Sequence, residues 1–153
     1  MAVFLVQHGK SLPKEQDPDK GLSQEGISDV ERIAGVAKNY GIRVSQIKHS
    51  GKKRAMQTAE ILANALQPPG GAQASNGLDP LDDVTKLAEH LSSRDDVMFV
   101  GHLPFMEKLT SYLTTGSTEK KVFKFQNGGI VCLGQNPEDR SWFIKWTLMP
   151  KIG

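Results

Sequence analysis

Two histidines in this chain each stand beside a glycine at the end of an apolar run. His8 and Gly9 follow the stretch AVFLVQ, while Gly101 and His102 close the stretch DVMFVGH. Arg54 lies between these two pairs in the sequence, directly after two lysines. A neutral imidazole can attack phosphorus, and a guanidinium can place two hydrogen bonds on phosphate oxygens. Glycine lets a tetrahedral anion approach the backbone closely. These residue types predict an anion site that contains a nucleophile.

The elements around these residues predict a sheet that gathers them at one edge. Short apolar runs are typical of buried strands, and the segments between them have helical spacing of apolar residues. We expect strands at 2–7, 44–50 and 96–101, helices at 23–40, 52–66, 82–93 and 104–114, a loop at 67–77, and β-like runs at 121–126, 128–134 and 141–148. In such folds, ligands bind beyond the carboxyl ends of the strands, and a helix N-terminus there favours an anion.

This order of elements indicates an α/β fold in one domain, residues 1–153. We expect a three-layer sandwich, in which helices cover both faces of a mostly parallel central sheet. The last two β-like runs, joined by NPEDR, are expected to form an antiparallel hairpin at an edge near the C-terminus.

Composition excludes several classes of protein. The chain is 38% hydrophobic and 24% charged, and no apolar run approaches the ~20 residues of a membrane helix. A net charge of +2 is too small for nucleic-acid binding, so we expect no nucleic-acid and no membrane partner. Cys132 is the only cysteine and lies in an apolar stretch, which favours a buried core residue. The N-terminus has no secretion signal, so we expect a cytoplasmic protein. The expected helix 52–66 has enough polar residues for an exposed surface, so we expect a monomer.

Three ordered motifs resemble those of the histidine phosphatase superfamily, the phosphoglycerate mutase-like proteins. VFLVQHGKS is similar to the strand that ends in Arg-His-Gly, HSGKKRAMQTAE is similar to Ser-x-x-x-Arg-Ala-x-Gln-Thr-Ala, and VMFVGHLPFME is similar to the apolar strand that ends in Gly-His. The short chain and the stretch KGLSQEG most resemble the SixA-type phosphohistidine phosphatases.

This resemblance implies a role for each matching residue. His8 would be the nucleophile that forms a phosphohistidine intermediate, and Gly9 would hold its imidazole through the backbone. Arg54 and, less directly, Lys20 would bind phosphate, while a protonated His102 would stabilise the phosphoryl oxygens. The implied activity is removal of phosphate from a protein histidine, without a metal or another cofactor. The implied partner is a phosphohistidine-bearing protein, such as a phosphorelay or phosphotransferase component in signal transduction.

Gln7 departs from the family pattern, which has arginine at this position. The amide offers neutral N–H donors instead of a charged fork. Loss of one preorganised donor costs about 10²–10³ in rate in comparable sites. Lys10, Lys20, Lys52 or Lys53 would have to restore the missing charge. We therefore expect Gln7→Arg to raise turnover unless the site is already compensated.

The general acid is open on sequence grounds. Asp79, Asp82 and Asp83 lie in the segment where superfamily members place an acidic residue. Asp82 and Asp83 can equally cap the following helix, and Asp79 precedes a proline and can simply shape a turn. A phosphoramidate substrate needs less help from an acid, because the departing imidazole can itself be protonated.

Three functions remain compatible with these residues. The first is a metal-independent phosphohistidine phosphatase that acts through phospho-His8. The second is a catalytically weak module that binds phosphate or phosphoproteins, which the exchange at Gln7 favours. The third is a phosphatase or mutase for a phosphorylated metabolite. A metal site built from the four histidines lacks the usual ligand spacing, so no metal residues are expected.

Overall fold

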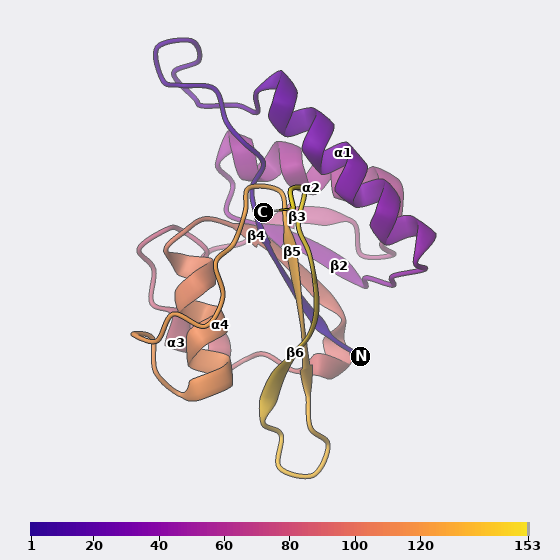
Figure 1. Ribbon diagram of the computed structural model, residues 1–153, viewed down its shortest axis with the longest axis vertical. Helices are drawn as coiled ribbons and strands as arrows, with labels where there is room; N and C mark the ends of the chain where they lie inside the picture. Colours follow the sequence, from indigo (N-terminus) through magenta and orange to yellow (C-terminus); the bar gives the residue numbers. More distant parts are fainter. Residues whose placement is uncertain (153) are drawn as a thin grey trace.

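Strand β1 (Val3–Gln7) lies at the centre of the sheet in the computed structural model, which describes residues 1–152 (Figure 1). In the described residues the sheet has the strand order β3-β2-β4-β1-β5-β6. The other strands and the helices are α1 (Gln24–Asn39), β2 (Gln46–His49), α2 (Lys53–Leu66), β3 (Ala72–Ala74), α3 (Val84–Ala88), a 3₁₀ turn (Ser93–Asp95), β4 (Val97–Gly101), α4 (Phe105–Thr115), β5 (Ile130–Gln135) and β6 (Trp142–Leu148).

The sheet is mostly parallel, as the sequence predicts. Strands β1, β2, β3 and β4 run parallel to one another, whereas β5 runs antiparallel to β1 and β6 antiparallel to β5. The β5–β6 hairpin occupies one edge of the sheet and extends beyond its body in Figure 1. The expected edge hairpin near the C-terminus is therefore confirmed.

Two apolar layers cover the two faces of the sheet. Alternate residues of β1 enter opposite layers: Phe4 and Val6 pack with α1 and α2, while Val3 and Leu5 pack with α3 and α4. All four side chains are buried, which explains why this strand is an uninterrupted apolar run. The three-layer α/β sandwich is thus confirmed, with one helix pair on each side (Figure 1).

Local signals place the helices close to their expected positions. Ser23 caps α1 by accepting a hydrogen bond from the amide of Gly26 at 3.0 Å, as its position predicts. Gly41, which directly follows the expected helix 23–40, has φ +71°, a conformation that glycine adopts readily. Helix α4 begins at Phe105, directly after Pro104.

Three expectations about elements are wrong. The segment 67–77 contains strand β3 in place of a continuous loop, and residues 121–126 form no strand. Helix α3 ends at Ala88 instead of near residue 93, and the chain then forms a 3₁₀ turn before β4. Phe125 of the segment 121–126 is buried in the apolar layer of α4, and its amide donates to the Glu107 carboxylate at 3.0 Å. The Glu107 side chain of α4 therefore accepts the hydrogen bond that a partner strand would accept from this segment.

Candidate active site

The catalytic candidates His8 and His102 leave the sheet side by side. Gln7 of β1 is in register with Gly101 of β4, so the next residue of each strand emerges at the same carboxyl edge. The two imidazole ring centroids lie 5.0 Å apart, with an angle of 53° between the ring planes. The structure therefore brings together the two histidines that the sequence singled out.

Backbone contacts fix the position of the His8 imidazole. Its Nδ1 lies 2.7 Å from the carbonyl oxygen of Gly9, which can only accept a hydrogen bond. Nδ1 therefore carries the proton, and the lone pair of a neutral ring lies on Nε2. The main chain of His8 is anchored as well, because its amide donates to the Gly101 carbonyl at 2.9 Å and its carbonyl accepts from Asn127 Nδ2 at 3.0 Å.

Burial keeps the His8 imidazole neutral. Its pKa is lowered to about 4, chiefly by desolvation and to a smaller extent by the positive charges of Arg54 and Lys20, while the hydrogen bond to Gly9 opposes the shift. A ring with this pKa is unprotonated at neutral pH. The Nε2 atom of His8 is thus available as a nucleophile without a separate base.

Gly9 is packed so tightly that a larger residue fits only if its neighbours shift. A Cβ atom at this position would lie 2.8 Å from Cγ2 of Val30 and 3.2 Å from the carbonyl oxygen of Gly26. The Gly9 amide donates to Thr58 Oγ1 at 2.9 Å, and that hydroxyl donates in turn to the Arg54 carbonyl at 2.8 Å. Thr58 therefore links the nucleophile loop to the first turn of α2.

His102 is more deeply buried than His8. Its side chain is 1% exposed, Nε2 lies 2.7 Å from the Ser50 hydroxyl, and Nδ1 is buried without a hydrogen-bond partner among the described residues. Burial lowers its pKa to about 3, and the positive charges of nearby groups, Arg54 among them, contribute. The free site therefore holds a neutral His102, in contrast to the protonated ring implied by the sequence resemblance. Protonation of this ring would have to accompany binding of an anion.

Arg54 lies in the first turn of α2, at the helix end that favours anions. Burial lowers the pKa of its guanidinium, which remains a cation because an arginine starts from a very high value. Its charge lowers the pKa of both catalytic candidates, His8 and His102. The geometry is thus compatible with the role of phosphate ligand that the resemblance implies.

Gln7 has a different environment from the histidine that follows it. Gln7 of β1 and Gly101 of β4 are register partners, so their side-chain positions lie on the same face of the sheet. A Cβ atom at Gly101 would meet Met106 of α4, so Gln7 lies on the face that α4 covers. The Gln7 side chain is 9% exposed, and its Oε1 is buried without a partner in the described part of the chain. It lines a cavity of about 810 Å³ together with Leu103 and Phe125. A neutral amide thus occupies the place of the family's arginine.

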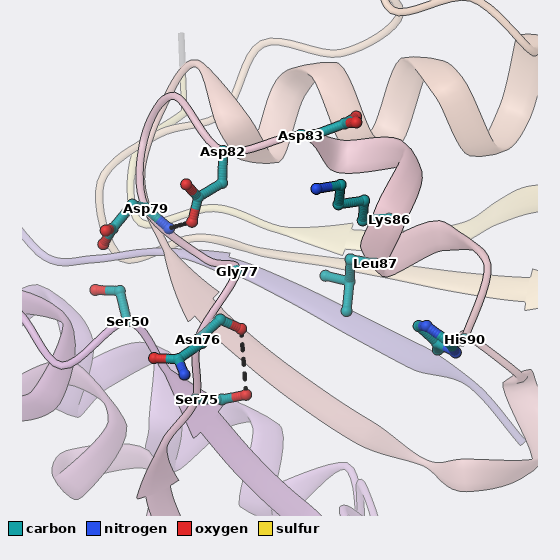
Figure 2. A pocket seen from close by; sticks show the side chains of 10 residues that line it. All are labelled: Ser50, Ser75, Asn76, Gly77, Asp79, Asp82, Asp83, Lys86, Leu87 and His90. Atoms are coloured by element: carbon teal, nitrogen blue, oxygen red, sulfur yellow. Dashed lines mark hydrogen bonds between the residues drawn. The ribbon is translucent and has the colours of Figure 1, made fainter.

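A second cavity, of about 520 Å³, begins at Ser50 and contains the candidate acids (Figure 2). Figure 2 shows Asp79 on the same side of this cavity as Ser50, with His90 at the opposite end. Asp82 accepts a hydrogen bond from the Asp79 amide at 2.9 Å, so it shapes the turn. Asp83 caps α3 by accepting from the Thr85 amide at 2.9 Å. Of the three acids, Asp79 is the one with an exposed carboxylate beside Ser50.

The four lysines named as substitutes for the missing arginine divide into two pairs. Lys10 forms an ion pair with Glu25 and Lys53 forms one with Asp17, each at 2.8 Å. Lys20 and Lys52 form no such ion pair with the described residues, and the charges of both lower the pKa of His102.

Sequence reasoning assigned no contact to three residues of the site. Ser50 and Thr58 are part of the recognised motif, but no contact to His102 or Gly9 is evident from spacing. Asn127 precedes a glycine in a loop and gives no sequence signal for its contact with the His8 carbonyl.

The remaining histidines play no part in these contacts. His49 is buried, and its Nδ1 accepts from the Gly51 amide at 3.1 Å. His90 lies beyond the end of α3, although the expected helix 82–93 includes it, and its side chain is exposed.

Within residues 1–152, no cluster of three or more histidine, cysteine, aspartate or glutamate side chains is arranged to hold a metal ion. In the same residues, no helix has the length and apolar character needed to span a membrane.

Comparison with known proteins places these features in a family. Residues 3–79 match the model of the histidine phosphatase superfamily, branch 1. The phosphohistidine phosphatase SixA of Escherichia coli K12 is 27% identical over 124 residues, which cover 77% of this chain and 77% of that protein.

Solved structures share the fold. The protein histidine phosphatase SixA complexed with tungstate has a TM-score of 0.81 at 24% identity, over 98% of this chain and 97% of that one. A mycobacterial glucosyl-3-phosphoglycerate phosphatase has a TM-score of 0.72 at 13% identity, over 95% of this chain and 97% of its own. At these identities the two structures support the fold alone. The family match covers half of the sequence and includes His8, Gly9 and Arg54. The chain therefore belongs to the histidine phosphatase superfamily, branch 1.

Proposed function

We propose that the protein is a phosphohistidine phosphatase that works through a covalent phosphate on His8. One observation carries the proposal: the Gly9 carbonyl holds Nδ1 of a neutral His8, which leaves Nε2 free beside the second imidazole, His102. Membership of a phosphatase superfamily supports hydrolysis of a phosphoryl compound. The similarity to a phosphohistidine phosphatase supports the choice of substrate.

The proposed reaction has two steps. His8 Nε2 attacks phosphorus, a new N–P bond forms, and the substrate's own P–N bond breaks with its electron pair going to the departing imidazole. Water then attacks the phosphorus of phospho-His8, which releases inorganic phosphate and returns His8 to its neutral form. Arg54 and the protonated imidazole of His102 would stabilise negative charge on the phosphoryl oxygens. Neither step requires a metal ion.

A phosphoramidate substrate suits this site because its cleavage needs no strong general acid. When the distal ring nitrogen of a phosphohistidine is protonated, P–N cleavage releases a neutral imidazole directly. A strong general acid is then unnecessary. Asp79 is the proposed acid for substrates with a poorer leaving group, because its carboxylate is exposed on the side of the cavity that contains Ser50. The proposed partner is a phosphohistidine-bearing protein. We propose that this chain acts on it as a monomer in the cytoplasm.

Phosphate release from a phosphohistidine-bearing protein tests the proposal. The assay contains EDTA and compares wild type with His8→Ala, and circular dichroism confirms that the variant is folded. We expect release by the wild type, and a loss of at least 10³-fold in the variant, since the nucleophile is absent. Equal rates for the two proteins would contradict the proposal.

Gln7 favours one alternative function, a module that binds phosphoproteins without turning them over. A neutral amide in place of a charged donor weakens transition-state stabilisation more than it weakens binding. Binding of phosphate without any release from phosphohistidine or phosphate esters would support this alternative. Faster release from small esters than from phosphohistidine would support a metabolite phosphatase instead.

A further inference from the structure

The phosphate site needs positive charge that Gln7 does not supply. A phosphoryl group carries close to two negative charges, and Arg54 provides one positive charge from the first turn of α2. The amide of Gln7 is neutral, and its Oε1 is buried without a partner in the described residues. The question is which other cation of this chain completes the site.

Ion pairs remove two of the four nearby lysines from consideration. Lys10 Nζ lies 2.8 Å from Glu25, which also binds Lys151 at 2.8 Å. Lys53 Nζ lies 2.8 Å from Asp17. A lysine already paired with a carboxylate gives up that partner when it moves to an incoming phosphate. Lys10 and Lys53 are therefore poor substitutes for the missing arginine.

Lys52 has the position that the missing charge requires. It is the N-cap residue of α2, two positions before Arg54, and its side chain is exposed and makes no capping hydrogen bond. Its amide lies 3.4 Å from the Ser50 hydroxyl, which in turn contacts His102. The backbone at Lys52 is therefore fixed beside the histidine pair, while its long side chain remains free to reach an anion.

Lys20 belongs to a different segment of the chain, the loop between β1 and α1. Its backbone has φ +52°, a conformation that residues with a side chain adopt at a cost of about 1 kcal/mol. The amide of Lys20 donates to the Asp17 carbonyl at 2.9 Å, which holds this turn. Its charge acts on both His8 and His102, whereas the charge of Lys52 acts on His102. The positive charges of both lysines therefore act on the histidine pair.

We propose that Lys52, together with Lys20, binds the phosphoryl group and supplies the charge that an arginine at position 7 supplies in relatives. The inference rests on the proposed function and names the ligands of its phosphate. It adds Lys52, which stands at an unspecified position of the family's second motif, to the residues that contact substrate. The site is then compensated, and Gln7 is no sign of an inactive enzyme.

Binding of inorganic phosphate to the free protein tests this inference without turnover. Isothermal titration calorimetry at low ionic strength compares wild type with Lys52→Met, Lys52→Arg and Lys145→Met. Lys145 lies on β6 at the edge of the sheet and is a matched control. We expect Lys52→Met to weaken phosphate binding about 5- to 10-fold, and Lys52→Arg and Lys145→Met to change it less than 2-fold. The deficit of Lys52→Met should shrink near 1 M salt, where exposed charges are screened.

A second set of variants restores the arginine that the family has at position 7. Gln7 borders a cavity of about 810 Å³, so a longer side chain has room. We expect Gln7→Arg to change phosphate affinity little in the wild type but to recover most of the loss in Lys52→Met. Equal affinity of Lys52→Met and wild type, or no binding of phosphate by the wild type, would overturn the inference. Phosphate binding that depends on Lys52, without release from phosphohistidine, would overturn the proposed function alone.

Discussion

The Ser50 hydroxyl lies 2.7 Å from Nε2 of His102, at the junction between the end of β2 and the end of β4. This contact joins the second motif of the family to the third. It also distinguishes the two ring nitrogens of His102, since Nε2 contacts the serine and Nδ1 is buried without a partner in the described residues. The serine is therefore expected to control the orientation of the second imidazole.

Replacing this serine should slow the reaction without removing it. We expect Ser50→Ala to lower kcat/KM about 10-fold, because the imidazole of His102 loses the hydrogen bond that orients it. Ser50→Thr retains the hydroxyl and should keep most of the activity. Initial rates of phosphate release from a phosphohistidine substrate measure both. Equal loss in both variants would show that steric fit, and not the hydroxyl, is what matters.

Two glycines of the same chain should respond in opposite ways to alanine. Gly9→Ala places a methyl group 2.8 Å from Val30, and overpacking of this kind costs about 1–3 kcal/mol of unfolding free energy. Gly35 lies inside α1, where a Cβ meets no atom within 4 Å, so Gly35→Ala should stabilise by about 0.5–1 kcal/mol. Urea unfolding measures both changes. A Gly9→Ala protein as stable as the wild type would contradict the tight packing described for the nucleophile loop.

The protein should lose stability as the pH falls below 6.5. The folded pKa of His8, about 4, lies below its unfolded value of 6.5, so the unfolded chain binds more protons between these values. The contribution of His8 to stability is therefore complete only well above pH 6.5, and it falls by about 3 kcal/mol towards pH 4. The His8→Asn variant should lose less stability over this range, because it lacks the titrating ring.

Carboxylates give a separate effect at lower pH. Asp17 and Glu25 have pKa values of about 2, below their ordinary values, because lysines donate hydrogen bonds to them. Their contribution is present above about pH 4.5 and is lost as the pH falls towards 2. Unfolding curves at pH 7, 6, 5 and 4.5 thus isolate the histidine effect. An identical pH dependence in wild type and His8→Asn would contradict the lowered pKa of His8.

Asp79 should matter more for esters than for phosphohistidine. An alkoxide leaving group needs a proton, whereas a protonated imidazole does not, so we expect Asp79→Asn to slow ester hydrolysis about 10²-fold and phosphohistidine hydrolysis less than 3-fold. Rates on p-nitrophenyl phosphate would understate the effect, because nitrophenolate leaves readily, so a simple alkyl phosphate is the better ester. Asp82→Asn disturbs the turn through the Asp79 amide and should affect both substrates alike. A uniform loss in Asp79→Asn would exclude it as the acid.

The centre of the fold could be predicted from the sequence because it is determined by burial. Both faces of β1 are covered, so Val3, Phe4 and Leu5 read as a continuous apolar run. Ser23 could be predicted as a cap because its contact with the Gly26 amide is local in sequence. Two errors arose where tertiary contacts decide: Ala72–Ala74 is exposed and has no apolar pattern, and it becomes β3 only by backbone pairing with β2. The segment 121–126 has an alternating apolar pattern but forms no strand. Phe125 instead packs in the apolar layer of α4, and its amide donates to Glu107.

The site could be predicted only as a set of residues, not as a set of contacts. The motifs indicate which side chains gather at the strand ends. The neutral state of His102 depends on burial from both layers and on surrounding charges, which no local pattern contains. The pairing of Lys10 and Lys53 with carboxylates likewise depends on distant residues. The resemblance singles out Lys20 among the four lysines, and only the structure separates Lys52 from the two paired lysines, Lys10 and Lys53.

The most direct test of the reaction is detection of phosphate on His8. The protein is mixed for milliseconds with a phosphohistidine protein labelled with ³²P, quenched with alkali, digested and analysed by mass spectrometry. We predict a label on His8 in the wild type that is stable to alkali and labile to acid, and none in His8→Asn. Release of labelled phosphate by the wild type with no label on His8 at any time, and continued release by His8→Asn, would contradict a covalent mechanism.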